Sequence, residues 1–305
     1  MREVILAPLR AVRLALAGLI AASVERWSAL EPLFTRAGRT LARRSRLGGS
    51  VYWLAQEALM ARLRQSGHRF REVTIRNTAV YVDVTDSCGR YPFFYARPYE
   101  QSVTDALLTA LKPSDVFIDV GANIGYFSSI AAKRVGNHGR VIAFEPHDGA
   151  REALRGSIER NAVSHIVEIV PLALAEREAD FTFYTTDHHS AYSTLDPERS
   201  PMRNVAAFHP STVVHATTLD DWLGARPELS GRVRCIKIDV EGVESRVVAG
   251  MTRTLQGTGL TIVCETTIGS EADVILERAG FRRHRIERGT SPYGNFLYVR
   301  PGPAG

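Results

Sequence analysis

The sequence predicts an α/β protein with a doubly wound, Rossmann-like sheet, and three observations indicate this fold class. Short apolar runs with the length of buried parallel strands recur at 116–120, 141–145, 166–170, 235–239 and 260–264. Segments with helical spacing follow several of them, at 124–134, 147–160 and 271–279. A turn at 291–295 between the expected strands 281–287 and 295–299 predicts an antiparallel pair that completes the sheet. Repeated strand–helix units of this kind wind into an open sheet with right-handed crossovers.

The composition is that of an ordinary globular protein and gives no indication of nucleic-acid binding. The 305 residues are 45% apolar and 23% charged, and the net charge is +5. All but three of the 38 basic residues are arginine, which we interpret as a compositional bias. Cys88, Cys235 and Cys264 are far apart and form no disulfide or metal pattern, which favours a reducing cytoplasm.

Residues 1–65 are predicted to form a basic helical appendage. An apolar run at 14–24 lies between arginines and is too short to span a bilayer. We expect its apolar stripe to pack on the main domain or on a partner. Two alternatives stay open, namely peripheral membrane contact through residues 1–30 as a basic amphipathic helix, and a cleaved signal peptide.

Residues 66–98 are predicted to form an antiparallel β lead-in to a main domain at 99–300. Period-two alternation is found at 73–76, 80–84 and 91–95, with turn residues between these segments. A capped amphipathic helix is expected at 102–112. Glu100 just precedes this helix, so it either reaches a ligand at the first strand of the sheet or merely caps the helix.

The loop after the first strand of the main domain predicts a ligand site. Gly121 and Gly125 stand where the chain must turn sharply, and the following helix directs its positive end at the ligand. Dinucleotide-binding folds have a middle glycine here that leaves room for a pyrophosphate. In this sequence Ala122 and Asn123 put side chains into that space. Asp119 favours a cationic ligand, so we expect S-adenosylmethionine rather than NAD. The alternative is an ordinary tight turn.

A second acid indicates that this ligand carries a nucleoside. Glu145 ends the second strand, 20 residues beyond Gly125, where an acid accepts hydrogen bonds from both hydroxyls of a ribose. Leu172 and Ala173 follow the third strand, and we expect them to line a slot for adenine.

The run 235–244 is the second informative stretch. Asp239 ends the fourth strand, beside the expected methyl group of the cofactor, and Glu241 and Glu244 are expected in the first turn of the next helix. Lys237 faces away from the apolar side of its strand, so it needs a carboxylate partner or a route to water.

The segment 175–217 interrupts the alternation of strands and helices. We expect a strand at 180–184, a loop at 187–195 and irregular chain at 196–212, before a helix that begins near Thr217. His188 and His189 are adjacent, which does not fit an i, i+4 pair of metal ligands. We expect this loop to lie over the site and touch the substrate; the alternative is a solvated loop.

Four motifs, taken in order, resemble the FkbM family of S-adenosylmethionine-dependent methyltransferases. They are 117–125, the step 144–146, the helix start 218–220 and the run 236–244, and the resemblance covers about 95–300. It implies a class I methyltransferase fold over 99–300 and O-methylation of a hydroxyl on a sugar or secondary metabolite. It further implies that Asp119, Gly121, Ala122, Asn123 and Gly125 surround the methionine end, that Glu145 with Pro146 holds the ribose, and that Asp239 lines the catalytic pocket.

The expected chemistry is an in-line displacement in which a carboxylate takes the proton of the acceptor hydroxyl. We assign Asp239 as the base and Glu241 as the second candidate. A divalent metal held by Asp239 and Glu265 is a competing hypothesis that we do not favour, so no metal is expected. Two rival functions are an NAD-dependent oxidoreductase and a non-catalytic, membrane- or complex-associated module. The segments 186–212 and 90–100 are expected to select the acceptor.

Overall fold

The structure is a computed structural model that describes residues 2–26, 28–96, 100–187 and 189–300. The chain divides into two compact units. The first comprises Met1–Val73 and Val82–Pro98, and the second comprises Thr74–Tyr81 and Tyr99–Gly305.

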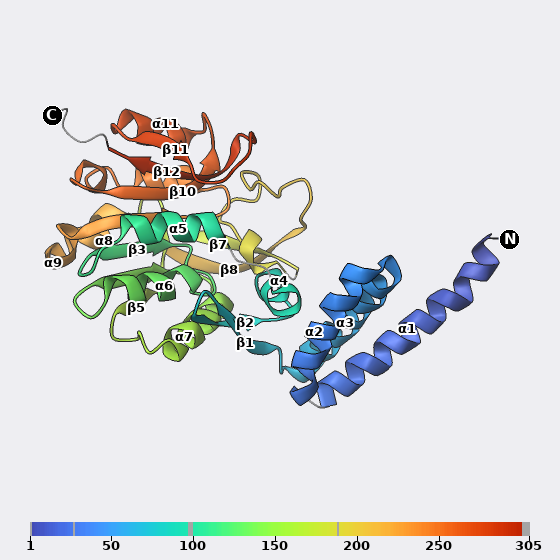
Figure 1. Cartoon of the computed structure of the whole chain (residues 1–305). Helices are drawn as coiled ribbons and strands as arrows, with labels where there is room; N and C mark the ends of the chain where they lie inside the picture. Colours follow the sequence, from blue (N-terminus) through green and yellow to red (C-terminus); the bar gives the residue numbers. More distant parts are fainter. Residues whose placement is uncertain (1, 27, 97–99, 188, 301–305) are drawn as a thin grey trace. The chain divides into compact units, whose positions relative to one another are not determined.

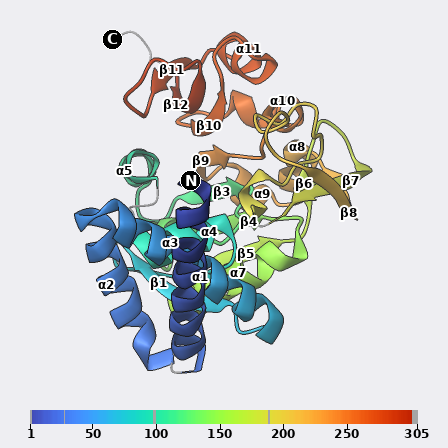
Figure 2. The same ribbon diagram turned by 90° about the vertical axis from the view of Figure 1, so that its right-hand side faces the viewer.

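The first unit is built from helices, as predicted for residues 1–65. Its elements are α1 (Arg2–Arg26), a 3₁₀ turn η1 (Ser28–Leu30), α2 (Glu31–Arg44), α3 (Arg46–Ser66) and α4 (Ser87–Tyr95). Helices α1 and α2 both pack on α3, which the ribbon in Figure 2 shows. Among the described residues, no helix is both long and apolar enough to cross a membrane.

Aromatic contacts hold this unit together. The Tyr52 hydroxyl on α3 donates a hydrogen bond of 2.8 Å to the carbonyl oxygen of Phe94. The ring of Phe34 meets the ring of Tyr52 edge to face, with 5.3 Å between their centroids. A Cβ at Gly38 would lie 2.0 Å from the Tyr52 ring, so glycine allows α2 to approach α3 closely.

The lead-in at 66–98 is only partly β-structure. Strands β1 (Phe70–Ile75) and β2 (Thr78–Asp83) form a two-stranded sheet, but the third strand predicted at 91–95 is wrong. This segment belongs to helix α4, because the Asp86 side chain caps the helix by accepting from the Cys88 amide at 3.0 Å. The alternation of aromatic residues at 91–95 had suggested a strand, whereas the buried positions follow the helix.

The second unit contains a seven-stranded sheet that confirms the predicted fold class. Its order is β11-β12-β10-β9-β3-β4-β5, and the central pairs are parallel (Figure 1). Strand β12 runs antiparallel to both β10 and β11, as the predicted final pair requires. The strands are β3 (Val116–Val120), β4 (Arg140–Phe144), β5 (Val167–Val170), β9 (Val233–Ile238), β10 (Thr261–Thr267), β11 (Arg282–Arg285) and β12 (Tyr293–Val299).

Helices cover both faces of this sheet. One face packs its isoleucines against α8, α10 and α11 in a single apolar cluster. The other face carries Asp119 and Lys237, and helix α6 packs over it. From α6, Ser128 contacts Asp119 and the ring of Phe127 contacts Lys237. The helices of this unit are α5 (Gln101–Ala110), α6 (Tyr126–Val135), α7 (Asp148–Arg160), α8 (Leu219–Gly224), α9 (Pro227–Ser230), α10 (Glu244–Ala249), the 3₁₀ turn η3 (Thr254–Gln256) and α11 (Glu271–Arg278).

A three-stranded sheet interrupts the alternation, and its extent was not predicted. It consists of β6 (Ala173–Leu174), β7 (Ala179–Thr186) and β8 (Phe208–Thr217) in the order β6-β8-β7, at the right of Figure 2. The expectation of irregular chain at 196–212 is therefore wrong from residue 208 onward. Strand β8 pairs with β7 over the whole length of β7, and this pairing is invisible in the exposed, polar sequence of β8.

The connections of the large sheet create a switch point. From β3 the chain moves outward through β4 to β5, and then returns to place β9 and β10 on the other side of β3. Ligands of open α/β sheets bind at the carboxyl ends of the strands beside such a point. Here the ends of β3 and β9 are so close that a Cβ on Gly121 would lie 2.0 Å from the carbonyl oxygen of Asp239.

We expect Gly121→Ala to destabilise the protein more than a glycine replacement in open space. Gly121 has φ +79°, and Gly269 has φ +78° with no atom near its Cβ position. Both replacements carry the left-handed backbone penalty of about 1–2 kcal/mol, and only the first adds a backbone clash of about 1–3 kcal/mol. Urea denaturation of both variants measures the difference, and equal losses of stability would contradict this account.

Candidate active site

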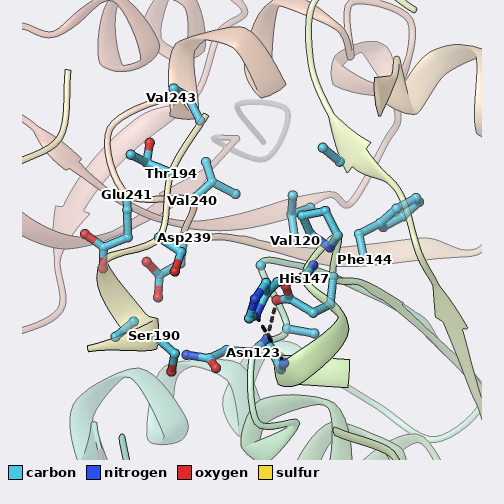
Figure 3. A pocket seen from close by; sticks show the side chains of 18 of the residues that line it. Val120, Asn123, Phe144, His147, Ser190, Thr194, Asp239, Val240, Glu241 and Val243 are labelled. Atoms are coloured by element: carbon cyan, nitrogen blue, oxygen red, sulfur yellow. Dashed lines mark hydrogen bonds between the residues drawn. The ribbon is translucent and has the colours of Figure 1, made fainter. Parts of the chain in front are cut away.

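A cavity of about 260 Å³ lies at the switch point (Figure 3). The loop after β3 and the start of α6 form one wall, and the residues that follow β4 and β9 form others. The segment 190–195, which includes the 3₁₀ turn η2 (Ser190–Tyr192), contributes a further wall. The predicted loop at 187–195 therefore reaches the site.

Most residues that the sequence analysis assigned to the site line this cavity. They are Glu100, Gly121, Ala122, Asn123, Glu145, Pro146, Leu172, Asp239 and Glu241. Glu100 is also the N-cap residue of α5: its carbonyl oxygen accepts from the Thr104 amide at 2.9 Å, while its side chain forms no capping hydrogen bond.

Asp119 and Gly125 are not among the residues that line the cavity. Asp119 is fully buried, and the Ser128 hydroxyl on α6 donates a hydrogen bond of 2.6 Å to its Oδ2. Burial raises the pKa of Asp119 despite the opposing charge of Lys237. At Gly125, the Leu154 side chain lies where a Cβ would project, 2.5 Å away. Both residues support the loop from within the protein, which differs from their expected contact with the ligand.

Glu145 is held rigidly at the edge of the cavity. Its Oε2 accepts a hydrogen bond of 2.9 Å from the Asn123 amide, and its Oε1 accepts one of 2.9 Å from the His147 amide. Burial raises the pKa of Glu145 to about 7, although these two bonds favour the charged form. Each carboxylate oxygen has a second lone-pair direction, so Glu145 can still accept from a ligand.

Lys237 and Asp239 form an ion pair in the wall of the cavity. The Lys237 ammonium lies 2.8 Å from Asp239 Oδ2, which gives the lysine the carboxylate partner that its position in the strand required. Burial raises the pKa of Asp239, but Lys237 outweighs that effect and brings the pKa below its usual value. Burial likewise opposes the charge on Lys237, whose pKa is nevertheless raised by Asp239 and Asp119.

Two further acids gather at this ion pair. Glu265 lies in β10 beside Asp239 and shares hydrogen bonds with Asp239 and with the Tyr293 hydroxyl. Burial and the neighbouring carboxylates hold the pKa of Glu265 well above its ordinary value and raise that of Glu241 to about 9. Glu241 is not in a helix, contrary to expectation, because α10 begins only at Glu244. It occupies a left-handed loop position with φ +57°.

The sequence did not predict that His147 and Phe183 line the cavity. The rings of His147 and Phe183 stack with centroids 5.6 Å apart, and both line the cavity near Leu172 and Pro146. Phe183 lies in β7 of the small sheet, and nothing in the sequence relates it to the loop after β4. His189 is exposed and stacks on Tyr192 at 5.2 Å, whereas His188 lies outside the described residues.

The cavity suits a nucleoside that also carries a positive charge. Glu145 supplies acceptors for ribose hydroxyls, and Leu172, Ala173 and Phe183 supply an apolar wall for a base. The acids Asp239, Glu241 and Glu265 lie elsewhere in the same cavity, and Asp239 supplies a negative charge there. In Figure 3, Asp239 and Glu241 lie on one side, and Asn123 and His147 lie on the other. S-adenosylmethionine has both kinds of group, so the residues present fit it.

Fold and site together define an α/β protein of the Rossmann-like class with a cavity at the switch point of its sheet that fits a nucleoside cofactor. The chain belongs to the FkbM family of methyltransferases, because the family model described as "Methyltransferase FkbM domain" matches residues 119–283. Proteins of this family use S-adenosylmethionine, which confirms the predicted cofactor.

Individual relatives are similar over part of their length. The AMB antimetabolite synthetase AmbE of Pseudomonas aeruginosa is 31% identical over 232 residues, which are 64% of this chain and 11% of AmbE. The hexuronic acid methyltransferase AglP of Haloferax volcanii is 29% identical over 169 residues, which are 54% of this chain and 61% of AglP. A solved structure of the FkbM methyltransferase of Methylobacillus flagellatus is 16% identical with a TM-score of 0.42, over 91% of this chain and 60% of that one. The chain thus spans less than two thirds of each of these proteins.

The raised pKa of Glu145 predicts an unusual dependence of stability on pH. Its folded-state pKa of about 7 lies above the ordinary value of 4.5 that we take for the unfolded chain, so the folded state holds the proton more tightly. This contribution to stability is fully present below pH 4.5 and is lost as the pH rises through 7, by roughly 3 kcal/mol.

We therefore expect the stability of Glu145→Gln to depend less on pH than that of the wild type. Urea denaturation at pH 5, 7 and 9 measures this, with the exposed β5 residue Glu168, replaced by Gln, as the control. A Glu145→Gln curve parallel to the wild-type curve would show that the Glu145 carboxyl is not perturbed.

Proposed function

We propose that this protein transfers a methyl group from S-adenosylmethionine to a hydroxyl oxygen of a sugar or another small alcohol. The observation that carries the proposal is the cluster of carboxylates in the cofactor cavity, where Asp239 and Glu241 lie beside Lys237. Acids at this place can attract a cationic ligand and accept a proton from an acceptor hydroxyl.

Residues of this chain account for cofactor binding. Glu145 accepts from the ribose hydroxyls, while its bonds to two backbone amides fix the orientation of the carboxylate. Leu172, Pro146 and the stacked rings of His147 and Phe183 enclose the base. When bound, S-adenosylmethionine supplies a methyl group on a positively charged sulfur, for which the acidic side of the cavity is the complementary environment.

The chain must also accept a proton, because an alcohol is a weak nucleophile until its hydroxyl proton begins to leave. As the oxygen forms its new bond to the methyl carbon, that proton passes to a carboxylate. We assign Asp239 as the acceptor, since the ion pair with Lys237 keeps it ionised near neutral pH. Glu241 is the second candidate, because its raised pKa makes it the stronger base once it has lost its proton.

The electrostatics of the cavity favour a hydroxyl acceptor over a carboxylate acceptor. A carboxylate needs no base, and the charge of Asp239 would repel it. AglP is named for methyl transfer to hexuronic acid, a sugar acid that carries both hydroxyls and a carboxylate. This similarity supports a sugar as the acceptor.

We expect S-adenosylhomocysteine to bind the purified protein and Glu145→Ala to weaken this binding about 10- to 100-fold, the effect of losing hydrogen bonds to a charged group. Isothermal titration calorimetry measures both affinities, with Glu168→Ala as the exposed control. Binding of NAD in place of S-adenosylhomocysteine, or unchanged affinity in Glu145→Ala, would overturn the cofactor assignment.

Asp239→Asn should reduce turnover about 100-fold or more, the usual contribution of a general base. Its affinity for S-adenosylhomocysteine should stay within a few-fold of the wild-type value, because Glu145 is unchanged. Single-turnover methyl transfer to a panel of glycosides measures the rate, and Asp180→Asn, an exposed change on β7, is the control. Full turnover in Asp239→Asn would remove Asp239 from this role and leave Glu241.

A further inference from the structure

Three carboxylates at the cofactor cavity are arranged as oxygen ligands around a single point. One oxygen each of Asp239, Glu241 and Glu265 lies within 4.8 Å of the other two. The sheet produces this arrangement, because the parallel register pairs Ile238 with Cys264 and so places Asp239 beside Glu265. Glu241 joins from the loop after β9, where it has a left-handed backbone that few residues other than glycine adopt.

A buried amide oxygen next to this cluster has no hydrogen-bond partner. Asn295 lies directly opposite Glu265 in the antiparallel pair of β10 and β12, so the two side chains share one face of the sheet. Tyr293, two residues earlier on the same face, reaches Glu265. Asn295 is only 6% exposed, and its Oδ1 accepts no hydrogen bond among the described residues. A buried amide oxygen without a donor is unfavourable unless a ligand satisfies it.

Asp239 is the acid of the cluster that contacts a cationic side chain, the Lys237 ammonium at 2.8 Å. Glu244 is not part of the cluster, and its Oε1 accepts from the Gly242 and Val240 amides. A divalent cation at the cluster would displace the protons that Glu241 and Glu265 retain, and the carboxylate and amide oxygens on offer are the ligands that hard cations prefer.

We propose that Asp239, Glu241 and Glu265, with Asn295 adjoining, form a site for a divalent cation such as Mg²⁺ or Mn²⁺. This proposal rests on the proposed function and adds to it the chemical class of the acceptor. A hard cation keeps positions open for further oxygens, so the acceptor would be a compound with two neighbouring oxygens, such as a vicinal diol of a sugar. Asp239 is paired with an ammonium and is a weak base, and a cation on the acceptor oxygen makes its proton easier to remove.

Titration of the cofactor-free protein with Mn²⁺ tests the site without any methyl acceptor. Calorimetry, or the loss of the electron paramagnetic resonance signal of free Mn²⁺, should show one ion per chain, displaced by Mg²⁺. Glu265→Gln and Glu241→Gln should each weaken binding by about 10-fold or more. Glu271→Gln is the matched control, because Glu271 is an exposed acid paired with Arg199. It should bind Mn²⁺ like the wild type.

Two outcomes would overturn the cation site. One is no binding of Mn²⁺ to the wild type at millimolar concentration; the other is equal binding by the wild type, Glu265→Gln and Glu241→Gln. Glu241→Gln changes a loop residue, so it keeps the test decisive if Glu265→Gln fails to fold. Calorimetry with S-adenosylhomocysteine on the same samples separates this result from the transferase proposal. Cofactor binding without Mn²⁺ binding would remove the cation and leave the transferase.

Discussion

The buried ammonium of Lys237 is the interaction on which the site depends. It projects from the centre of the sheet, 3% exposed, and contacts Asp239 at 2.8 Å, while Asp119 lies opposite it on β3. The Phe127 ring of α6 covers it, with the ammonium 4.9 Å from the ring centroid. A buried lysine is tolerated only beside carboxylates, and removal of one partner of such a pair is strongly destabilising. The charge of Lys237 therefore links the packing in the centre of the sheet to the electrostatics of the cavity.

This arrangement divides the acids of the cavity into two groups. Asp239, which contacts the ammonium, stays ionised, whereas Glu241 and Glu265 are buried beside it and hold their protons more tightly. Groups whose environments separate their pKa values are typical of sites that move protons or hold ions. A cationic cofactor and a bound cation would both be attracted by this cluster of acids, so both proposals arise from one electrostatic feature.

The glycine motif illustrates what a sequence pattern does and does not reveal. Gly121 and Gly125 were expected to let a ligand approach the backbone. Both have the positive φ that a sharp turn needs, but the atoms that crowd them belong to Asp239 and Leu154. The motif therefore preserves the packing of the β3 end against β9 and of the loop against α7. The effect on ligand binding is indirect, because that packing fixes the Asn123 amide in its hydrogen bond to Glu145.

The sequence by itself determined the succession of strands and helices that build the large sheet, the glycine loop, Glu145 after the second strand and Asp239 after the fourth. Local apolar periodicity and turn residues carry that information, because both act over a few neighbouring positions. Tertiary structure alone decided that Asp119 supports α6 from within, that 91–95 is helical, and that Phe183 stacks on His147. It also placed Asn295 opposite Glu265. These relations depend on strand register and on contacts between residues that are far apart in the chain, which no local pattern records.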